Sequence, residues 1–169
     1  MSRSLPSLLT IAALFVLSTS IECFSQQQPP APRPAAARAA AAKPAAPKVH
    51  RVVIQVTQND PALMSIALNN AENLSNYFEQ KDQRVQIEFV AYGPGLHMLR
   101  SDTSPVRDRI KSFAEKNKKV TFSGCGNTLN AQSKQENKEI ALLPEARVVP
   151  AGIARIIELQ EQGWTYVRP

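Results

Sequence analysis

The fold is decided by a short stretch in which a strand pattern leads directly into a helix start, His50-Arg-Val-Val-Ile-Gln-Val-Thr-Gln-Asn-Asp-Pro61. The β-branched residues within 50–56 predict a strand. Asp60 is a residue type that caps helices, and Pro61 suits the first helical position, where its missing N–H has no partner to lose. Apolar residues then recur at helical spacing, which predicts an amphipathic helix as far as about Gln80.

The same order of strand and helix repeats along the rest of the chain. Strand patterns cover residues 85–91, 120–122, 147–149 and 164–167, and helical patterns begin near Ser104, Thr128 and Pro150. Repeated units of this kind predict parallel strands, because each crossover helix returns the chain to the same edge of the sheet. We therefore expect a three-layer α/β fold with flavodoxin-like layering, in which a mainly parallel sheet of about five strands carries helices on both faces.

In parallel sheets, ligands bind at the carboxyl ends of the strands. The loops that matter are therefore 57–60, 91–99 and 124–128. Within the second loop, Tyr92–His97 is predicted to be a glycine–proline turn. The last helix is expected to carry Ile153, Ile156, Ile157 and Gln160 on one face.

The N-terminal part of the chain predicts export. Residues 1–25 combine Arg3, an apolar run over 8–17 and small residues near the end, which is the pattern of a secretory signal peptide. The apolar run is shorter than the roughly 20 residues that a membrane-spanning helix needs. We therefore expect a periplasmic protein with no stable membrane span after cleavage; an uncleaved anchor is the alternative. Residues 26–48 are rich in proline and alanine and predict an extended linker before a domain over 49–169.

The charge distribution argues against a nucleic-acid partner. The whole chain has a net charge of +6, but the linker holds four basic side chains and no acidic ones. From Val49 onward, 15 lysines and arginines face 13 aspartates and glutamates. A nearly neutral domain lacks the clustered cations that neutralise phosphates. With two cysteines and two histidines in the chain, we expect no multi-ligand metal site and no cofactor.

Cys125 is the main candidate for chemistry. It follows a predicted strand and precedes a helix, between Gly124 and Gly126, which permit a tight turn and a close backbone approach. A helix N-terminus lowers the pKa of a thiol from about 8.5 and favours the nucleophilic thiolate. Two alternatives remain open at this point, a small buried apolar residue and an intermolecular disulfide.

Other candidate residues lie in the neighbouring loops. Tyr92, Gly93 and His97 follow the second strand and are expected beside the loop of Cys125. His97 is a candidate acid or base near neutral pH, with a surface or core histidine as the alternative. Asn127 and Thr128 either donate hydrogen bonds to a sulfur-bound anion or cap the helix.

Four segments resemble the DsrE/DsrF-like family of sulfur-relay proteins, and its exported branch in particular. They are Phe122-Ser-Gly-Cys125-Gly-Asn-Thr-Leu129, Val148-Val-Pro-Ala-Gly-Ile153, Glu158-Leu-Gln-Glu-Gln-Gly-Trp-Thr-Tyr-Val-Arg-Pro169 and, after the second strand, Val90-Ala-Tyr-Gly-Pro-Gly-Leu96. The resemblance covers roughly residues 50–169 and implies a three-layer α/β fold that assembles into homo- or hetero-oligomers. It also implies a cysteine that carries sulfur as a persulfide, and Cys125 matches that position.

These observations predict an exported sulfur-handling protein. Cys125 would accept sulfane sulfur as a persulfide from a small donor and pass it to an acceptor thiol or protein. Because the protein would carry sulfur rather than turn over a substrate, the sequence leaves open whether it is an enzyme. One alternative is an oligomeric binding or assembly module with an inert Cys125, and another is a redox-sensing thiol, which lacks an obvious resolving cysteine.

Overall fold

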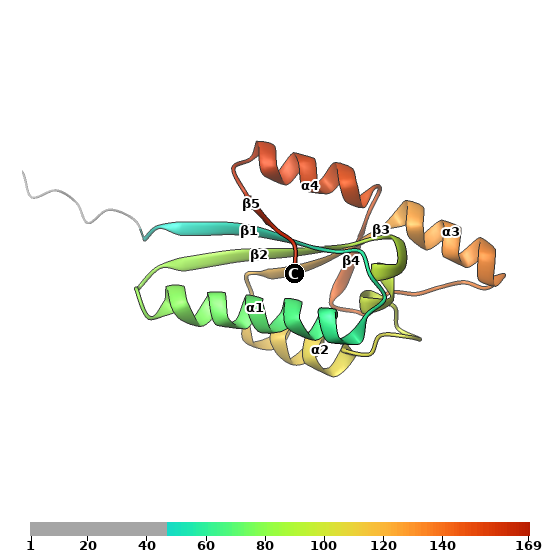
Figure 1. Ribbon diagram of the computed structural model, residues 1–169, viewed down its shortest axis with the longest axis horizontal. Helices are drawn as coiled ribbons and strands as arrows, with labels where there is room; N and C mark the ends of the chain where they lie inside the picture. The colour runs from blue at the N-terminus through green and yellow to red at the C-terminus, as the bar shows by residue number, and fades with distance from the viewer. Residues whose placement is uncertain (1–46) are drawn as a thin grey trace, which may run out of the picture. The chain divides into compact units, whose positions relative to one another are not determined.

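A computed structural model describes residues 47–169, so the predicted signal peptide and nearly all of the linker lie outside the described residues. The described chain forms a five-stranded sheet in the order β4-β3-β2-β1-β5, and every pair of neighbouring strands is parallel (Figure 1). The strands are β1 (Val49–Val56), β2 (Arg84–Ala91), β3 (Val120–Cys125), β4 (Ala146–Val149) and β5 (Thr165–Val167). The predicted α/β fold with a parallel sheet is confirmed.

Helices cover both faces of the sheet. They are α1 (Pro61–Glu79), α2 (Arg107–Lys116), α3 (Gly126–Glu136) and α4 (Gly152–Glu161), with a 3-10 helix η1 (Gly93–Leu99) after β2. Figure 1 shows α1 and α2 on one side and α4 on the other, with α3 at the end of the sheet where β3 finishes. The predicted start of α1 is confirmed, because the Asp60 carboxylate accepts hydrogen bonds from the N–H groups of Ala62 and Leu63 at 2.8 and 3.3 Å.

The two faces of the sheet bury very different amounts of apolar surface. Under α1 and α2 lies a large core that includes Phe89 and Phe122, whose rings stack with centroids 4.9 Å apart. Between α4 and the sheet the core contains only four buried residues, Val53 and Val90 from the sheet and Ile156 and Leu159 from α4. Because burial of apolar area is the main stabilising term in folding, the α1 and α2 side carries most of the stability.

Two local expectations are corrected. The segment predicted as a glycine–proline turn is the 3-10 helix η1, which buries Leu96, Met98 and Leu99. Gly95 lets η1 approach the end of β1 closely, since a Cβ at this position would lie 2.3 Å from the carbonyl oxygen of Val56. In α4, Ile156 is buried, but Ile153 and Ile157 are 55% and 51% exposed, so the predicted apolar face is divided between core and solvent.

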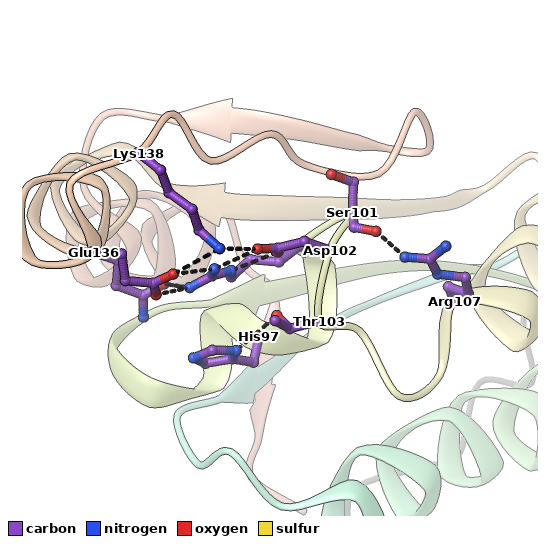
Figure 2. A network of polar contacts seen from close by, with 9 residues as sticks. His97, Ser101, Asp102, Thr103, Arg107, Glu136 and Lys138 are labelled. Carbon is purple, nitrogen blue, oxygen red and sulfur yellow. Dashed lines mark hydrogen bonds and ion pairs between the residues drawn. The ribbon is translucent and has the colours of Figure 1, made fainter.

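A buried arginine fixes α3 to the segment that follows η1. The side chain of Arg100 is fully buried, and its guanidinium bonds to Asp102, Gln132 and Glu136. Lys138 adds ion pairs of 2.9 Å to Asp102 and 3.1 Å to Glu136 (Figure 2). Since Gln132 and Glu136 belong to α3, the C-terminal half of this helix is held by a charge that has no access to water.

Replacing Arg100 with methionine should reduce the free energy of unfolding at neutral pH by about 2–3 kcal/mol. The loss is smaller than for breaking a fully buried ion pair, because Asp102 and Glu136 keep about a third of their side-chain surface in water. Hydrogen bonds from Arg100 lower the pKa of both carboxyls below their usual range, to about 2 for Glu136. The two carboxylates therefore contribute fully to folding stability at pH values above the ordinary carboxyl pKa of about 4. This stability is lost as the pH falls through their lowered pKa values.

Urea unfolding followed from neutral to acidic pH measures this difference. The wild type should lose stability more steeply on acidification than Arg100→Met. Arg109→Met is the matched control, because Arg109 bonds to neutral acceptors, the backbone carbonyl of Ser65 and the amide of Asn69. Parallel acid profiles for wild type and Arg100→Met would contradict the assignment.

Candidate functional site

Cys125 lies where two helices begin. It is the last residue of β3 and is 6% exposed, and α3 starts at the next residue. In the β3–β4 ladder Cys125 pairs with Val149, the last residue of β4. Only Pro150 and Ala151 separate Val149 from the first residue of α4. The parallel register therefore brings the N-termini of α3 and α4 to the same sulfur atom.

Hydrogen-bond donors from both helices surround the sulfur of Cys125 and lower its pKa. The donors are the hydroxyl of Thr128 and the backbone N–H groups of Gly152, Thr128 and Asn127. Burial raises the pKa of the Cys125 thiol, but these hydrogen bonds outweigh that effect and bring the pKa below its ordinary value. Each helix also directs the positive end of its dipole toward the sulfur. The arrangement favours the thiolate over the thiol.

The glycines around Cys125 are closely packed. A Cβ on Gly126 would lie 3.2 Å from Val148, and one on Gly152 would lie 2.9 Å from the ring of Tyr92. On the other side, a Cβ on Gly124 would meet Leu142 at 2.7 Å. None of these three glycines has a positive φ. The glycines beside Cys125 thus serve close approach rather than the tight turn that was also expected of them.

The predicted pocket residues Tyr92, Gly93 and Thr128 do come together with Cys125. The hydroxyl oxygen of Thr128 accepts a hydrogen bond from the N–H of Gly93 at 3.0 Å, and the side chain of Gln132 donates to the carbonyl of Gly93 at 3.2 Å. Thr128 therefore links η1 to α3 and the sulfur, and it does not cap α3, which has no side-chain cap. The backbone N–H of Asn127 faces the sulfur, and it donates a hydrogen bond to the carbonyl oxygen of Pro150 at 3.2 Å.

His97 does not join this site. Its Nδ1 lies 2.8 Å from the hydroxyl oxygen of Thr103, in the neighbourhood of the Arg100 cluster (Figure 2). It is not among the groups that bond to the sulfur of Cys125. The 3-10 helix carries this side chain away from the loop in which it was expected to meet the thiol. The geometry therefore gives His97 no acid–base role at Cys125.

A buried carboxylate that the sequence analysis missed lies under α4. Glu88 is 2% exposed, and its oxygens accept hydrogen bonds from Arg155 at 2.8 and 2.9 Å, from Arg147 at 3.0 Å and from Ser123 at 2.7 Å. Burial raises the pKa of Glu88, but these donors outweigh it and the pKa is lowered. Because Arg155 belongs to α4 and Arg147 to β4, Glu88 anchors the two elements that lead to Gly152.

A groove of about 280 Å³ runs beside this anchor. Its lining consists of Arg147, the segment 148–151, Ala154, Arg155 and Glu158. Cys125 does not line the groove, but the lining includes Val149, its partner in the β3–β4 ladder, and Ala151, which precedes Gly152. Within residues 47–169, no cluster of three or more His, Cys, Asp or Glu side chains is placed to hold a metal ion.

Replacing Thr128 with valine should raise the pKa of Cys125, because the isosteric change removes the hydroxyl donor to the sulfur. The pH dependence of alkylation by iodoacetamide measures this. The wild-type midpoint should lie below the ordinary thiol value of about 8.5, and that of Thr128→Val should be higher. Thr165→Val on β5, which is separated from β3 by two strands, is the matched control. Equal midpoints for Thr128→Val and the wild type would contradict the arrangement.

Comparison with known proteins assigns no function to this site. No family model matches the chain, and no curated protein matches it. None of the helices in the described part of the chain has the length and apolar character needed to cross a membrane.

A solved structure does match, that of the protein of unknown function MTH1491 from Methanobacterium thermoautotrophicum. The two share 32% sequence identity, the match covers 71% of this chain and 99% of the other, and the TM-score is 0.61. The chain therefore belongs to the same protein family as MTH1491.

Proposed function

We propose that the protein carries sulfane sulfur as a persulfide on Cys125. The observation that supports this most strongly is the set of donors around the sulfur, which come from two helix N-termini and the hydroxyl of Thr128. Donors of this kind stabilise a negative charge on sulfur, both on the resting thiolate and on a persulfide anion. The likeness of residues 122–129 to DsrE/DsrF-like proteins points to the same chemistry.

The transfer takes place in two exchange steps. The Cys125 thiolate attacks the sulfane sulfur of a polysulfide or persulfide donor, so that a new S–S bond forms and the donor leaves as a thiolate or shortened polysulfide. An acceptor thiolate then attacks the terminal sulfur, which breaks the S–S bond to Cys125 and restores its thiolate. No net oxidation occurs, because each S–S bond that forms replaces one that breaks.

The small exposed fraction of Cys125 limits the size of the sulfur donor. Cys125 is only 6% exposed, which favours a slender donor. A linear polysulfide meets that requirement better than a bulky electrophile does. We place this carrier in the periplasm as an oligomer, on the strength of the N-terminal signal pattern and of the family resemblance.

Intact-mass measurement of the folded protein tests the proposal. After brief treatment with polysulfide and removal of the excess, the wild type should gain the mass of one or more sulfur atoms. Cys125→Ser should gain none, and addition of a low-molecular-weight thiol should remove the extra mass from the wild type. Thr128→Val should be labelled more slowly near neutral pH, because less of its Cys125 is thiolate.

The other functions give different results in the same measurement. A Cys125 that stays unmodified until the protein is unfolded would indicate an inert buried thiol and a binding module. A protein that ignores polysulfide but gains oxygen from dilute peroxide would indicate a redox sensor. In residues 47–169 Cys125 is the only cysteine, so that part of the chain offers no resolving thiol.

A further inference from the structure

The groove beside Glu88 contains a guanidinium that the protein uses only in part. The side chain of Arg147 lines this groove and is 51% exposed. Its Nε and Nη2 donate hydrogen bonds to Ser123 and to Glu88, at 3.1 and 3.0 Å. These two bonds engage one side of the guanidinium, and Nη1 has no hydrogen-bond partner among residues 47–169. Because an arginine has five N–H groups, the outer end of Arg147 keeps donors that are available to a ligand.

The charges along the groove are arranged unevenly. Glu88 binds Arg155 through both carboxylate oxygens, at 2.8 and 2.9 Å, and shares only one of these oxygens with Arg147. Glu158, the other carboxylate near the groove, forms its ion pair with Arg155 at 3.3 Å. Both carboxylates are therefore engaged mainly by Arg155. The groove is positive at Arg147 and negative at Glu158.

The strand register sets the distance between Arg147 and the thiol. In the β3–β4 ladder Arg147 pairs with Ser123, and Cys125 lies two residues further along β3. Alternate residues of a strand share a face, and Ser123 bonds to Glu88 beneath α4, so Arg147 and Cys125 lie on the side that α4 covers. Two residues of a strand span roughly 7 Å. A ligand held at Arg147 must extend by about this length, past the apolar side chain of Val149, to reach the thiol.

We propose that the groove binds the carboxylate end of a small organic persulfide, whose sulfane sulfur is thereby presented to Cys125. This inference rests on the sulfur carriage proposed above and names the class of donor. The free end of the Arg147 guanidinium matches the two oxygens of a carboxylate. Val149, Ala151 and Ala154 line the groove with apolar surface that suits a short aliphatic chain between the two ends of the donor.

The anchored donor reacts by a balanced exchange. The Cys125 thiolate attacks the sulfane sulfur, a new S–S bond forms on Cys125, and the S–S bond of the donor breaks. The donor leaves as a thiolate that still carries its carboxylate. Donor and thiolate are both negatively charged, so the positive charge of Arg147 also reduces the repulsion between them as they approach.

Alkylation by two reagents of equal length tests the groove without any sulfur transfer. One is 4-(iodoacetamido)butanoate, which carries a carboxylate at the end of its chain, and the other is the neutral N-butyl iodoacetamide. Labelling of the purified full chain is followed on the peptide that contains Cys125, because the sequence also contains Cys23. The wild type should react faster with the anionic reagent at low concentration, and this rate should saturate as the concentration rises. The ratio of the two rates at one pH is independent of the fraction of thiolate.

Variants of the two charged ends should change this ratio in opposite directions. Arg147→Gln should lower it about tenfold or more and raise the half-saturating concentration of the anionic reagent, with the maximal rate unchanged. Arg147→Lys, which keeps the charge but not the fork, should fall between Arg147→Gln and the wild type. Glu158→Gln should raise the ratio, because it removes the carboxylate that repels the ligand. Arg84→Gln is the matched control, since Arg84 is an exposed arginine at the start of β2, far from the strand ends, and should leave the ratio unchanged.

Three outcomes would overturn the proposal. These are equal rates for the two reagents in the wild type, a ratio that Arg147→Gln leaves unchanged, and a Cys125 that neither reagent modifies in the folded protein. Should Arg147→Gln fail to fold, the direction of the change in Glu158→Gln decides.

The test separates this inference from the sulfur-carrier proposal. A protein that gains sulfur from polysulfide but does not prefer the anionic reagent would overturn only the carboxylate site. A protein that prefers the anionic reagent through Arg147 but never gains sulfur would contradict sulfur carriage and the persulfide identity of the ligand, and would leave the carboxylate site supported.

Discussion

The pairing of β3 with β4 is the constraint on which the candidate site depends. Parallel register places Cys125 opposite Val149, so the strand that carries the thiol and the strand that leads to α4 end side by side. Neither helix alone would supply all the donors that reach the sulfur, because Asn127 and Thr128 begin α3 whereas Gly152 begins α4. A slip of the edge strand β4 by one residue would move Gly152 away from the sulfur and turn the side chains of β4 to the opposite face of the sheet.

Each of these two helices is held by a buried charge. Arg100 secures α3 through Gln132 and Glu136, and Glu88 secures α4 through Arg155. Buried ion pairs contribute little net stability compared with well-packed apolar residues, but they fix the geometry of the elements that they join. The two anchors therefore explain how helices at the edge of the main core keep N–H groups directed at one sulfur atom.

The elements that the sequence predicted well are those specified by local signals. Asp60-Pro61 marks the start of α1, and the alternation around Ile87 and Phe89 marks β2, because caps and strand periodicity depend on neighbouring residues. The position of Cys125 at a strand end followed from the same reasoning. Gly152 was missed as a donor because it lies 27 residues after Cys125, and only the strand register brings the two together.

Other features depend on how distant elements pack together, which the local sequence pattern does not show. Glu88 lies between the buried residues Ile87 and Phe89 in β2, a pattern that predicts a side chain facing solvent. Only the position of Arg155 in α4 shows that the Glu88 side chain is covered. Helical spacing grouped Ile153 with Ile156 but could not show how much of α4 the sheet would cover. His97 was misplaced because its segment coils into a 3-10 helix, which changed the direction of its side chain relative to an extended loop.

The difference in size between the two hydrophobic cores also affects which part of the protein unfolds locally first. Proteins unfold locally in cooperative units, and the units with the smallest apolar contacts open at the lowest free energy. Here the core between α4 and the sheet has four buried residues, two of them from α4 itself, whereas α1 and α2 cover a core several times larger. Amide hydrogens of α4 should therefore exchange with solvent before those of α1. Each such opening withdraws the Gly152 donor and uncovers the sulfur further, so the local stability of a single helix sets how readily bulkier reagents reach Cys125.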